Sequence, residues 1–157
     1  MKIRLGLAHS SDVPTLAAMA GTLIEHGLPP TWGEGRLRRC LFHRDYVVLV
    51  ARDGRRIAGF AVMEFLDRHA HLALFAVAPA YQGRGVGRSL LEWLEATART
   101  AGTFHIELEV RAANVAARRF YARVGYAEAG LRRAYYAGRE DAVRMTRNLA
   151  IAQPQAF

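Results

Sequence analysis

The chain has 157 residues, a length typical of one globular domain with its own core. Its composition, 52% apolar and 23% charged, is that of an ordinary globular protein, and no apolar run approaches the roughly 20 residues that a membrane helix needs. The formal charge of +8 favours anionic partners, but the basic residues are spread along the chain, so charge alone selects no class of partner.

The compartment can be predicted from two features. The residues Met1–Gly6 lack the apolar segment of a secretion signal, and Cys40 is the only cysteine, so no internal disulfide can form. A lone thiol fits a reducing compartment. We therefore expect a cytoplasmic protein with no membrane partner.

The first half of the chain alternates between helical and strand patterns. Apolar residues spaced three and four apart from Val13 to Ile24 predict a helix, with Ser11 or Asp12 as its N-cap and Pro29-Pro30 beyond its end. Asp53-Gly54 is a strong hairpin signal. The expected elements are strands over 2–7, 46–51, 56–65 and 71–78, the first helix over about 11–25, and a second over 34–42.

The second half supplies the remaining elements. We expect a helix from near Arg88 to a C-cap at Gly102, a strand over 104–111, a helix over 114–124, and strands over 126–132 and 141–148 around a loop at Tyr135–Gly138. The predicted fold class is α+β, with a mostly antiparallel sheet of about seven strands and about four flanking helices. Residues 1–149 would form one domain and 150–157 a C-terminal tail.

The turn Gln82–Gly87 is the strongest functional signal. It joins an apolar strand to the start of a helix, and its glycines allow backbone N–H groups to approach a ligand closely. The first amides of a helix lack intrahelical acceptors and favour an anion. Arg84 and Arg88 add positive charge. The turn is therefore predicted to bind a phosphorylated ligand.

Two well-known phosphate motifs fit this turn poorly. A Walker A loop needs Gly-Lys-Ser/Thr at its end, whereas Gly87 precedes Arg88-Ser89 and Gln82 stands where the motif's first glycine belongs. A dinucleotide fingerprint needs a glycine where Arg88 stands, and it follows a parallel βαβ unit rather than an antiparallel meander.

A third interpretation of the turn also accounts for residues downstream of it. The pattern Gln82-x-x-Gly85-x-Gly87 resembles the pyrophosphate-binding signature of the GNAT superfamily of N-acetyltransferases. The downstream residues resemble the RimI-like branch, which acetylates N-terminal alanine of a ribosomal protein. These residues are Leu108-Glu109-Val110-Arg111, Asn114, Phe120-Tyr121 and Gly125-Tyr126.

The resemblance implies the acyl-CoA N-acyltransferase fold and acetyl-CoA as co-substrate. It places the acetyl and pantetheine groups beside the backbone of a strand that splays from its neighbour, and the pyrophosphate at the glycine turn. The implied cofactor-binding residues are Phe75, Ala76, Val77, Gln82, Gly83, Arg84, Gly85, Val86, Gly87, Arg88 and Asn114.

Two residues are predicted to carry the chemistry. An amine must lose a proton before it attacks a thioester, and the departing thiolate must gain one. By resemblance Glu109 is the general base, directly or through a water, and Tyr121 is the general acid. Spacing alone would equally allow a solvated strand glutamate, a core tyrosine with a satisfied hydroxyl, and Asn114 as a helix N-cap.

The acceptor is the least determined part. Trp32, Tyr135 and Tyr136 are predicted to contact it. The acceptor would be a primary amine, either a protein N-terminus or a small molecule such as an amino acid, polyamine or antibiotic. A non-catalytic module that binds acyl-CoA or nucleic acid is a further, less favoured alternative, and the protein would be a monomer or homodimer.

Two other chemistries have weak support in the sequence. Cys40 has no recognisable His or acidic partner and is expected in the core rather than as an acyl-accepting nucleophile. His69 and His71 would share a strand face, but no third ligand stands at convincing spacing, so no metal site is predicted.

Overall fold

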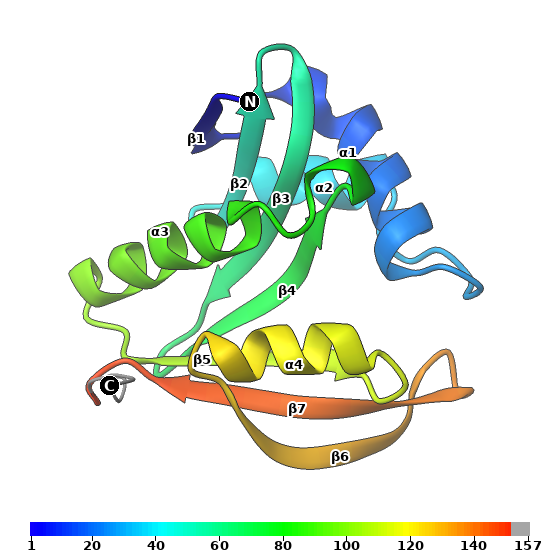
Figure 1. Cartoon of the computed structure of the whole chain (residues 1–157), viewed down its shortest axis with the longest axis vertical. Coiled ribbons are helices and arrows are strands. Elements are labelled where there is room, and N and C mark those ends of the chain that lie inside the picture. The colour runs from blue at the N-terminus through cyan, green and yellow to red at the C-terminus, as the bar shows by residue number, and fades with distance from the viewer. Residues whose placement is uncertain (152–157) are drawn as a thin grey trace.

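The computed structural model describes residues 1–151 and forms a seven-stranded sheet with helices on both faces (Figure 1). The strands are β1 (Ile3–Leu7), β2 (Tyr46–Asp53), β3 (Arg56–Phe65), β4 (Ala70–Val77), β5 (His105–Arg111), β6 (Ala127–Tyr136) and β7 (Glu140–Asn148). The helices are α1 (Val13–Met19), α2 (Glu34–Leu41), α3 (Val86–Thr100) and α4 (Val115–Arg123), with shorter helical turns η1 (Ser10–Asp12), η2 (Ala20–Ile24) and η3 (Pro79–Tyr81).

The strands follow the order β1-β2-β3-β4-β5-β7-β6. Every neighbouring pair is antiparallel except β4 and β5, which run parallel and are joined through α3. The predicted α+β class with a mostly antiparallel sheet is confirmed. The tail expected over 150–157 lies, from residue 152 on, outside the described residues.

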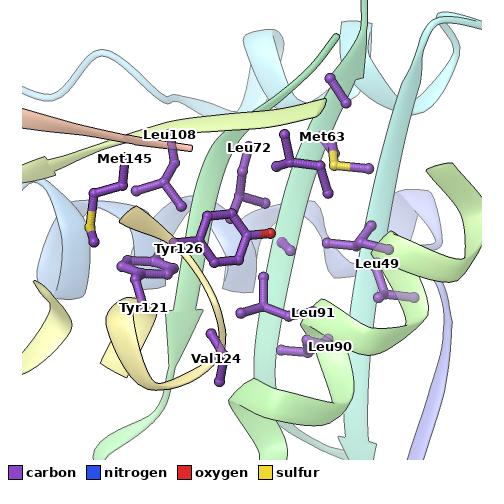
Figure 2. Close-up of a cluster of buried hydrophobic side chains, with 14 of the residues drawn as sticks. Leu49, Met63, Leu72, Leu90, Leu91, Leu108, Tyr121, Val124, Tyr126 and Met145 are labelled. Carbon is purple, nitrogen blue, oxygen red and sulfur yellow. The ribbon is translucent and has the colours of Figure 1, made fainter. Parts of the chain in front are cut away.

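The two faces of the sheet bury separate cores. On one face, α3 and α4 pack against the strands through residues such as Leu90, Leu91 and Tyr121, as Figure 2 shows for part of this cluster. On the other face, α1 and α2 bury Leu16, Leu37 and the rest of a second cluster against β2, β3 and β4. Because α3 and α4 cover one face and α1 and α2 the other, the central strands are apolar on both sides.

A one-residue bulge in β4 creates the feature on which the site depends. In the pairing of β3 with β4, Val62 faces Leu74 and Met63 faces Leu72, so Ala73 is the extra residue. The bulge reverses the alternation of side chains: Leu72 belongs to the core under α3 and α4, and Leu74 to the core under α1 and α2.

The bulge coincides with the end of β4–β5 pairing. The two strands are paired only from Ala70 opposite Ile106 to Leu72 opposite Leu108. Beyond these residues they diverge, and Figure 1 shows β4 running away from β5 toward α1. In residues 1–151, the side of β4 that faces β5 therefore has no strand partner after Leu72. One carbonyl of this stretch, that of Val77, accepts the side-chain amide of Gln82.

Three local expectations were wrong. Asp12 does not cap the first helix: its carboxylate accepts the His9 amide at 2.7 Å and pairs with Arg52. Tyr135 and Tyr136 do not form a loop but end β6. The helix expected from near Arg88 starts earlier, at Val86. The Asp12 carboxylate is held by Arg52, far away in sequence, and α3 begins directly after the glycine turn. Boundaries of elements are the part of a fold that sequence patterns predict least precisely.

Within residues 1–151, none of the helices has both the length and the apolar character that crossing a bilayer would require.

Candidate functional site

A cleft of about 520 Å³, here called the turn cleft, lies over the glycine turn. Its walls come from the end of β4, from α4 and from the turn, so elements far apart in sequence meet there. Its lining includes Phe75, Ala76, Val77, Gln82, Gly83, Gly85, Gly87, Arg88, Asn114, Phe120 and Tyr121. Most of the predicted cofactor-binding residues are thus brought to one cleft, where their role stays a prediction.

The turn presents a run of unpaired backbone donors. Within the described residues, none of the amide N–H groups from Gly83 to Arg88 donates to a protein acceptor, and the first helical bond is from Ser89 to Gly85 at 3.0 Å. Gly83 and Gly85 have φ of +73° and +82°, which favour glycine. Gln82 anchors the turn by donating its side-chain amide to the Val77 carbonyl at 3.0 Å. These donors, at the positive end of α3, suit an anion.

The individual turn residues contribute in different ways. Gly87 leaves room for α4: a Cβ there would lie 3.1 Å from Cζ of Phe120. Val86 is buried in the core. Arg88 lines the turn cleft, whereas Arg84 does not line it and lies 3.9 Å from the Met1 sulfur. Of the two arginines of the turn, Arg88 is therefore the one that lines the cleft.

A second cavity of about 710 Å³, here called the open-face cavity, lies on the other side of the split between β4 and β5. Its walls come from the loop after η2, from the polar face of β5 and from the turn between β6 and β7. Its lining includes Leu23, His26, Trp32, Arg36, His71, Phe75, Glu109, Arg111, Asn114, Tyr121, Tyr135, Tyr136 and Glu140. The three residues predicted to contact an acceptor, Trp32, Tyr135 and Tyr136, all line this cavity.

The two cavities meet where the strands part. Both are lined by Leu23, Phe75, Asn114, Ala117 and Tyr121. Asn114 also caps α4, because its side chain accepts the Ala117 amide at 3.1 Å. A ligand in the turn cleft and a second molecule in the open-face cavity could therefore come into contact beside Tyr121.

Tyr121 is held rigidly at this junction. Its ring packs against Phe75, Phe120 and Tyr126, with ring centroids 5.4–5.8 Å apart, and the residue is only 7% exposed. Burial raises the pKa of the phenol well above its usual value of 10, so it is protonated at neutral pH. Within residues 1–151 its hydroxyl has no hydrogen-bond partner, which leaves the proton available to a ligand.

Glu109 is not free in the open-face cavity. Its side chain is 10% exposed, and its Oε2 lies 2.6 Å from Nε2 of His71. Burial alone would raise the pKa of the carboxyl, but the hydrogen bond from His71 and the charges of His71, Arg132 and Arg144 outweigh it, so the pKa is lowered. The same hydrogen bond raises the pKa of His71 above its usual 6.5, against the effect of burial.

The pairing of His71 with Glu109 was missed by sequence reasoning, which considered His71 only as a metal ligand. The signal that could have found it is the parallel register of β4 and β5, which puts His71 and Glu109 on the same sheet face. In the described chain no group of three or more His, Cys, Asp or Glu side chains could hold a metal ion. Cys40 is buried in the core under α1 and α2 and lines neither cavity.

Arg111 is a second residue that sequence reasoning missed. Its Nη2 donates to the His26 carbonyl at 2.7 Å, its Nη1 lies 3.7 Å from Glu140, and its guanidinium lies over the Tyr136 ring. It thus ties together two walls of the open-face cavity. Its Nε is the one buried side-chain polar atom within residues 1–151 that has no hydrogen-bond partner.

Glu25 holds in place the loop after η2, which forms one wall of the open-face cavity. Its carboxylate accepts the backbone amides of Thr31 and Trp32 at 2.8–3.0 Å and the Thr31 hydroxyl at 2.6 Å. These bonds satisfy a carboxylate that is only 9% exposed. The guanidinium of Arg36 then lies 3.7 Å from the centre of the Trp32 ring. Trp32 is therefore fixed at the cavity by interactions on both of its sides.

Residues 20–126, which contain both sides of the split and the glycine turn, match the model of the Acetyltransferase (GNAT) family. The chain belongs to the GNAT family. The resemblance inferred from the glycine turn and from the residues around Glu109 is thereby confirmed.

Relatives of this GNAT protein include a ribosomal protein bS18-alanine N-acetyltransferase from Salmonella typhimurium, which is 44% identical over 93 residues. The match covers 57% of this chain and 63% of that relative, so less than two thirds of the relative's length is spanned. The crystal structure of the ribosomal-protein-S18-alanine N-acetyltransferase from Escherichia coli superimposes with a TM-score of 0.81 at 30% identity, covering 99% of each chain.

A more distant neighbour is YncA from Salmonella typhimurium, solved with its cofactor acetyl-CoA. It aligns with a TM-score of 0.78 over 100% of both chains at 21% identity, which establishes a shared fold and no more. All three comparisons agree on the GNAT fold.

Proposed function

We propose that this protein is an N-acetyltransferase that moves the acetyl group of acetyl-CoA directly to a primary amine, and that this amine is a protein N-terminal α-amine. The observation that carries the proposal is the contact between two cavities beside Tyr121, one with unpaired amide donors and one with Glu109 in its wall. Direct transfer needs the two substrates to meet in this way.

Acetyl-CoA would occupy the turn cleft. Its pyrophosphate suits the unpaired amides of residues 83–88 and the charge of Arg88. Its pantetheine chain would lie along Phe75–Val77, where β4 has lost its neighbour, and backbone N–H groups there would receive the negative charge that develops on the thioester oxygen. The thioester would then lie beside Tyr121 and Asn114.

The chemistry assigns a role to each polar group at the junction. The acceptor enters the open-face cavity as an ammonium ion and loses a proton to the base provided by Glu109 and its surroundings. Its nitrogen attacks the thioester carbon, a C–N bond forms, and the C–S bond breaks. Tyr121 donates its proton to the departing thiolate, and its strongly raised pKa keeps the phenol protonated until then.

A protein N-terminus fits the open-face cavity better than a free polyamine does. The cavity is walled by Trp32, Tyr135 and Tyr136, side chains that can hold peptide groups by stacking and by hydroxyl contacts. The protein carries a net charge of +8, which disfavours a polycation. The related enzymes named above are alanine N-acetyltransferases of ribosomal protein bS18 or S18, so their acceptor is a protein.

The test is an acceptor screen with acetyl-CoA. Peptides with a free N-terminal alanine would be compared with the same peptides blocked at the α-amine but carrying a free lysine, and with polyamines and aminoglycosides. Released CoA thiol and the mass of each acceptor are measured. We expect acetylation of the free N-terminus alone; preferential acetylation of a small amine would overturn the choice of acceptor, and no CoA release with any amine would overturn the enzymatic function.

A further inference from the structure

We propose that His71 is the group that takes the proton from the acceptor ammonium, and that Glu109 acts through His71 as a positioning residue. This inference rests on the proposed function and deepens it, because it assigns the proton transfer to a different atom of the same site.

The first argument is geometric. His71 and Glu109 both line the open-face cavity, and Nε2 of His71 faces Oε2 of Glu109 at 2.6 Å. In the described chain Nδ1 of His71 has no hydrogen-bond partner and is not among the fully buried unpartnered atoms, so it is accessible on a residue that lines the open-face cavity. With the Nε2 proton held by Glu109, the lone pair of neutral His71 is on Nδ1.

The second argument is that both carboxylate oxygens of Glu109 already have partners. Oε2 already accepts from His71, and Oε1 lies 3.6 Å from Nε of Arg132. These contacts lower the pKa of Glu109 below its usual 4.5, which makes the carboxylate a poor acceptor for a proton from an ammonium of pKa about 8. The raised pKa of His71 lies closer to that of the amine, which is the better match for proton transfer.

The surrounding charges decide when His71 is neutral. Carboxylates from two neighbouring strands stabilise its protonated form, while the cations nearby act mainly on Glu109. At low pH His71 carries a proton and cannot accept another, so the reaction needs a pH above its raised pKa. The groups facing the pair are Glu64 on β3, Glu107 on β5, Arg132 and Tyr135 on β6, Arg144 on β7, and Arg36 of α2 at the cavity wall.

The proton step balances without any further reactant. The N–H bond of the acceptor ammonium breaks, an N–H bond forms at Nδ1 of His71, and Glu109 stabilises the resulting imidazolium through Nε2. The neutral amine attacks acetyl-CoA, the C–S bond breaks, and Tyr121 protonates the departing thiolate. As the amide forms, its nitrogen loses a second proton, which restores the phenol of Tyr121. His71 then releases its proton to water, so each turnover yields one acetylated amine, CoA and one proton.

The decisive experiment compares three variants in rate–pH profiles with one α-amine peptide. His71→Gln should lower kcat/KM by about 10²-fold or more at pH 7 and recover toward high pH, where the amine is already neutral. In Glu109→Gln, kcat/KM should still rise with pH, but the rise should occur at lower pH. The reason is that Gln can still accept a hydrogen bond from Nε2 without raising the pKa of His71. His69→Gln, on the residue before β4, is the matched control and should behave as wild type.

The opposite result is equally well defined. If Glu109 is the direct base, His71→Gln frees it from its cation and raises its pKa, so activity should persist or increase, while Glu109→Gln should abolish the rise. That pattern would overturn the inference. Imidazole added to His71→Ala should restore part of the lost rate; no restoration with acetyl-CoA binding intact would also count against it.

Two further measurements separate this inference from the function it rests on. NMR titration of the His71 ring in the absence of substrate should give a pKa above 6.5 that falls in Glu109→Gln; an equal pKa in both proteins would contradict the proposed coupling. If wild-type protein transfers acetyl groups and His71→Gln does so equally, only the inference fails. If wild-type protein transfers none, the proposed function fails.

Discussion

Removal of the Tyr121 hydroxyl should separate catalysis from stability. The change Tyr121→Phe keeps the ring, whose contacts with Phe75, Phe120 and Tyr126 hold the junction together. The hydroxyl has no hydrogen-bond partner within residues 1–151 and opens to the cavities. The free energy of unfolding should therefore change by less than about 0.5 kcal/mol, whereas loss of a general acid should lower kcat by about 10²- to 10⁴-fold.

The neighbouring Tyr126 provides the matched control (Figure 2). Its hydroxyl donates to the buried carboxylate of Glu95 at 3.1 Å, and Glu95 also accepts from Arg147 at 2.7 Å. A hydrogen bond to a charged group contributes about 1.5–3 kcal/mol. Tyr126→Phe should therefore lower the melting temperature by several degrees, at about 2–4 °C per kcal/mol for a domain of this size, with kcat close to wild type.

The assays are urea or thermal unfolding for stability, single-turnover acetyl transfer for chemistry, and calorimetric titration with acetyl-CoA for binding. Tyr121→Phe should bind acetyl-CoA with wild-type affinity. If Tyr121→Phe costs more than about 1 kcal/mol of stability, the hydroxyl has a structural partner. If its single-turnover rate equals that of wild type, Tyr121 is not the general acid.

Two predictions concern the turn cleft. Gly85→Ala and Gly102→Ala each place a side chain at positive φ, +82° and +77°, with no neighbour within 4 Å, so each should lose about 1–2 kcal/mol of stability. Only Gly85→Ala should weaken acetyl-CoA binding measured by calorimetry. Equal affinities of the two variants would contradict the anion site. Arg88→Ala should weaken binding more than Arg84→Ala, by a factor that shrinks as salt rises, because Arg88 lines the cleft; equal losses at every salt concentration would contradict this ranking.

The sequence predicted those parts of the molecule whose causes are local. The Asp53-Gly54 turn, the strand Arg56–Phe65 and the periodicity of α3 each depend on residues within one element. The glycine turn likewise has its signal within a few residues of its own strand and helix. This is why the fold class and the anion site could be predicted before any tertiary contact was known.

The open-face cavity depends instead on contacts across the chain. His71 and Glu109 are 38 residues apart, and Arg111 reaches the His26 carbonyl across 85 residues. Sequence periodicity places each of these residues on a strand face but does not say which side chain it meets. The predicted acceptor residues came from resemblance, and what holds them in place was visible only in the structure.

The bulge at Ala73 connects the two halves of the site, and nothing in the apolar run of β4 marks it. Before it, His71 faces the open-face cavity while β4 is still paired with β5; after it, Phe75 turns toward Tyr121 and the strand leaves its neighbour. The same extra residue therefore opens the backbone of β4 to a thioester and keeps a base on the acceptor side. Because the proton acceptor and the thioester groove belong to one strand, a change in the register of β4 would disturb both substrates at once.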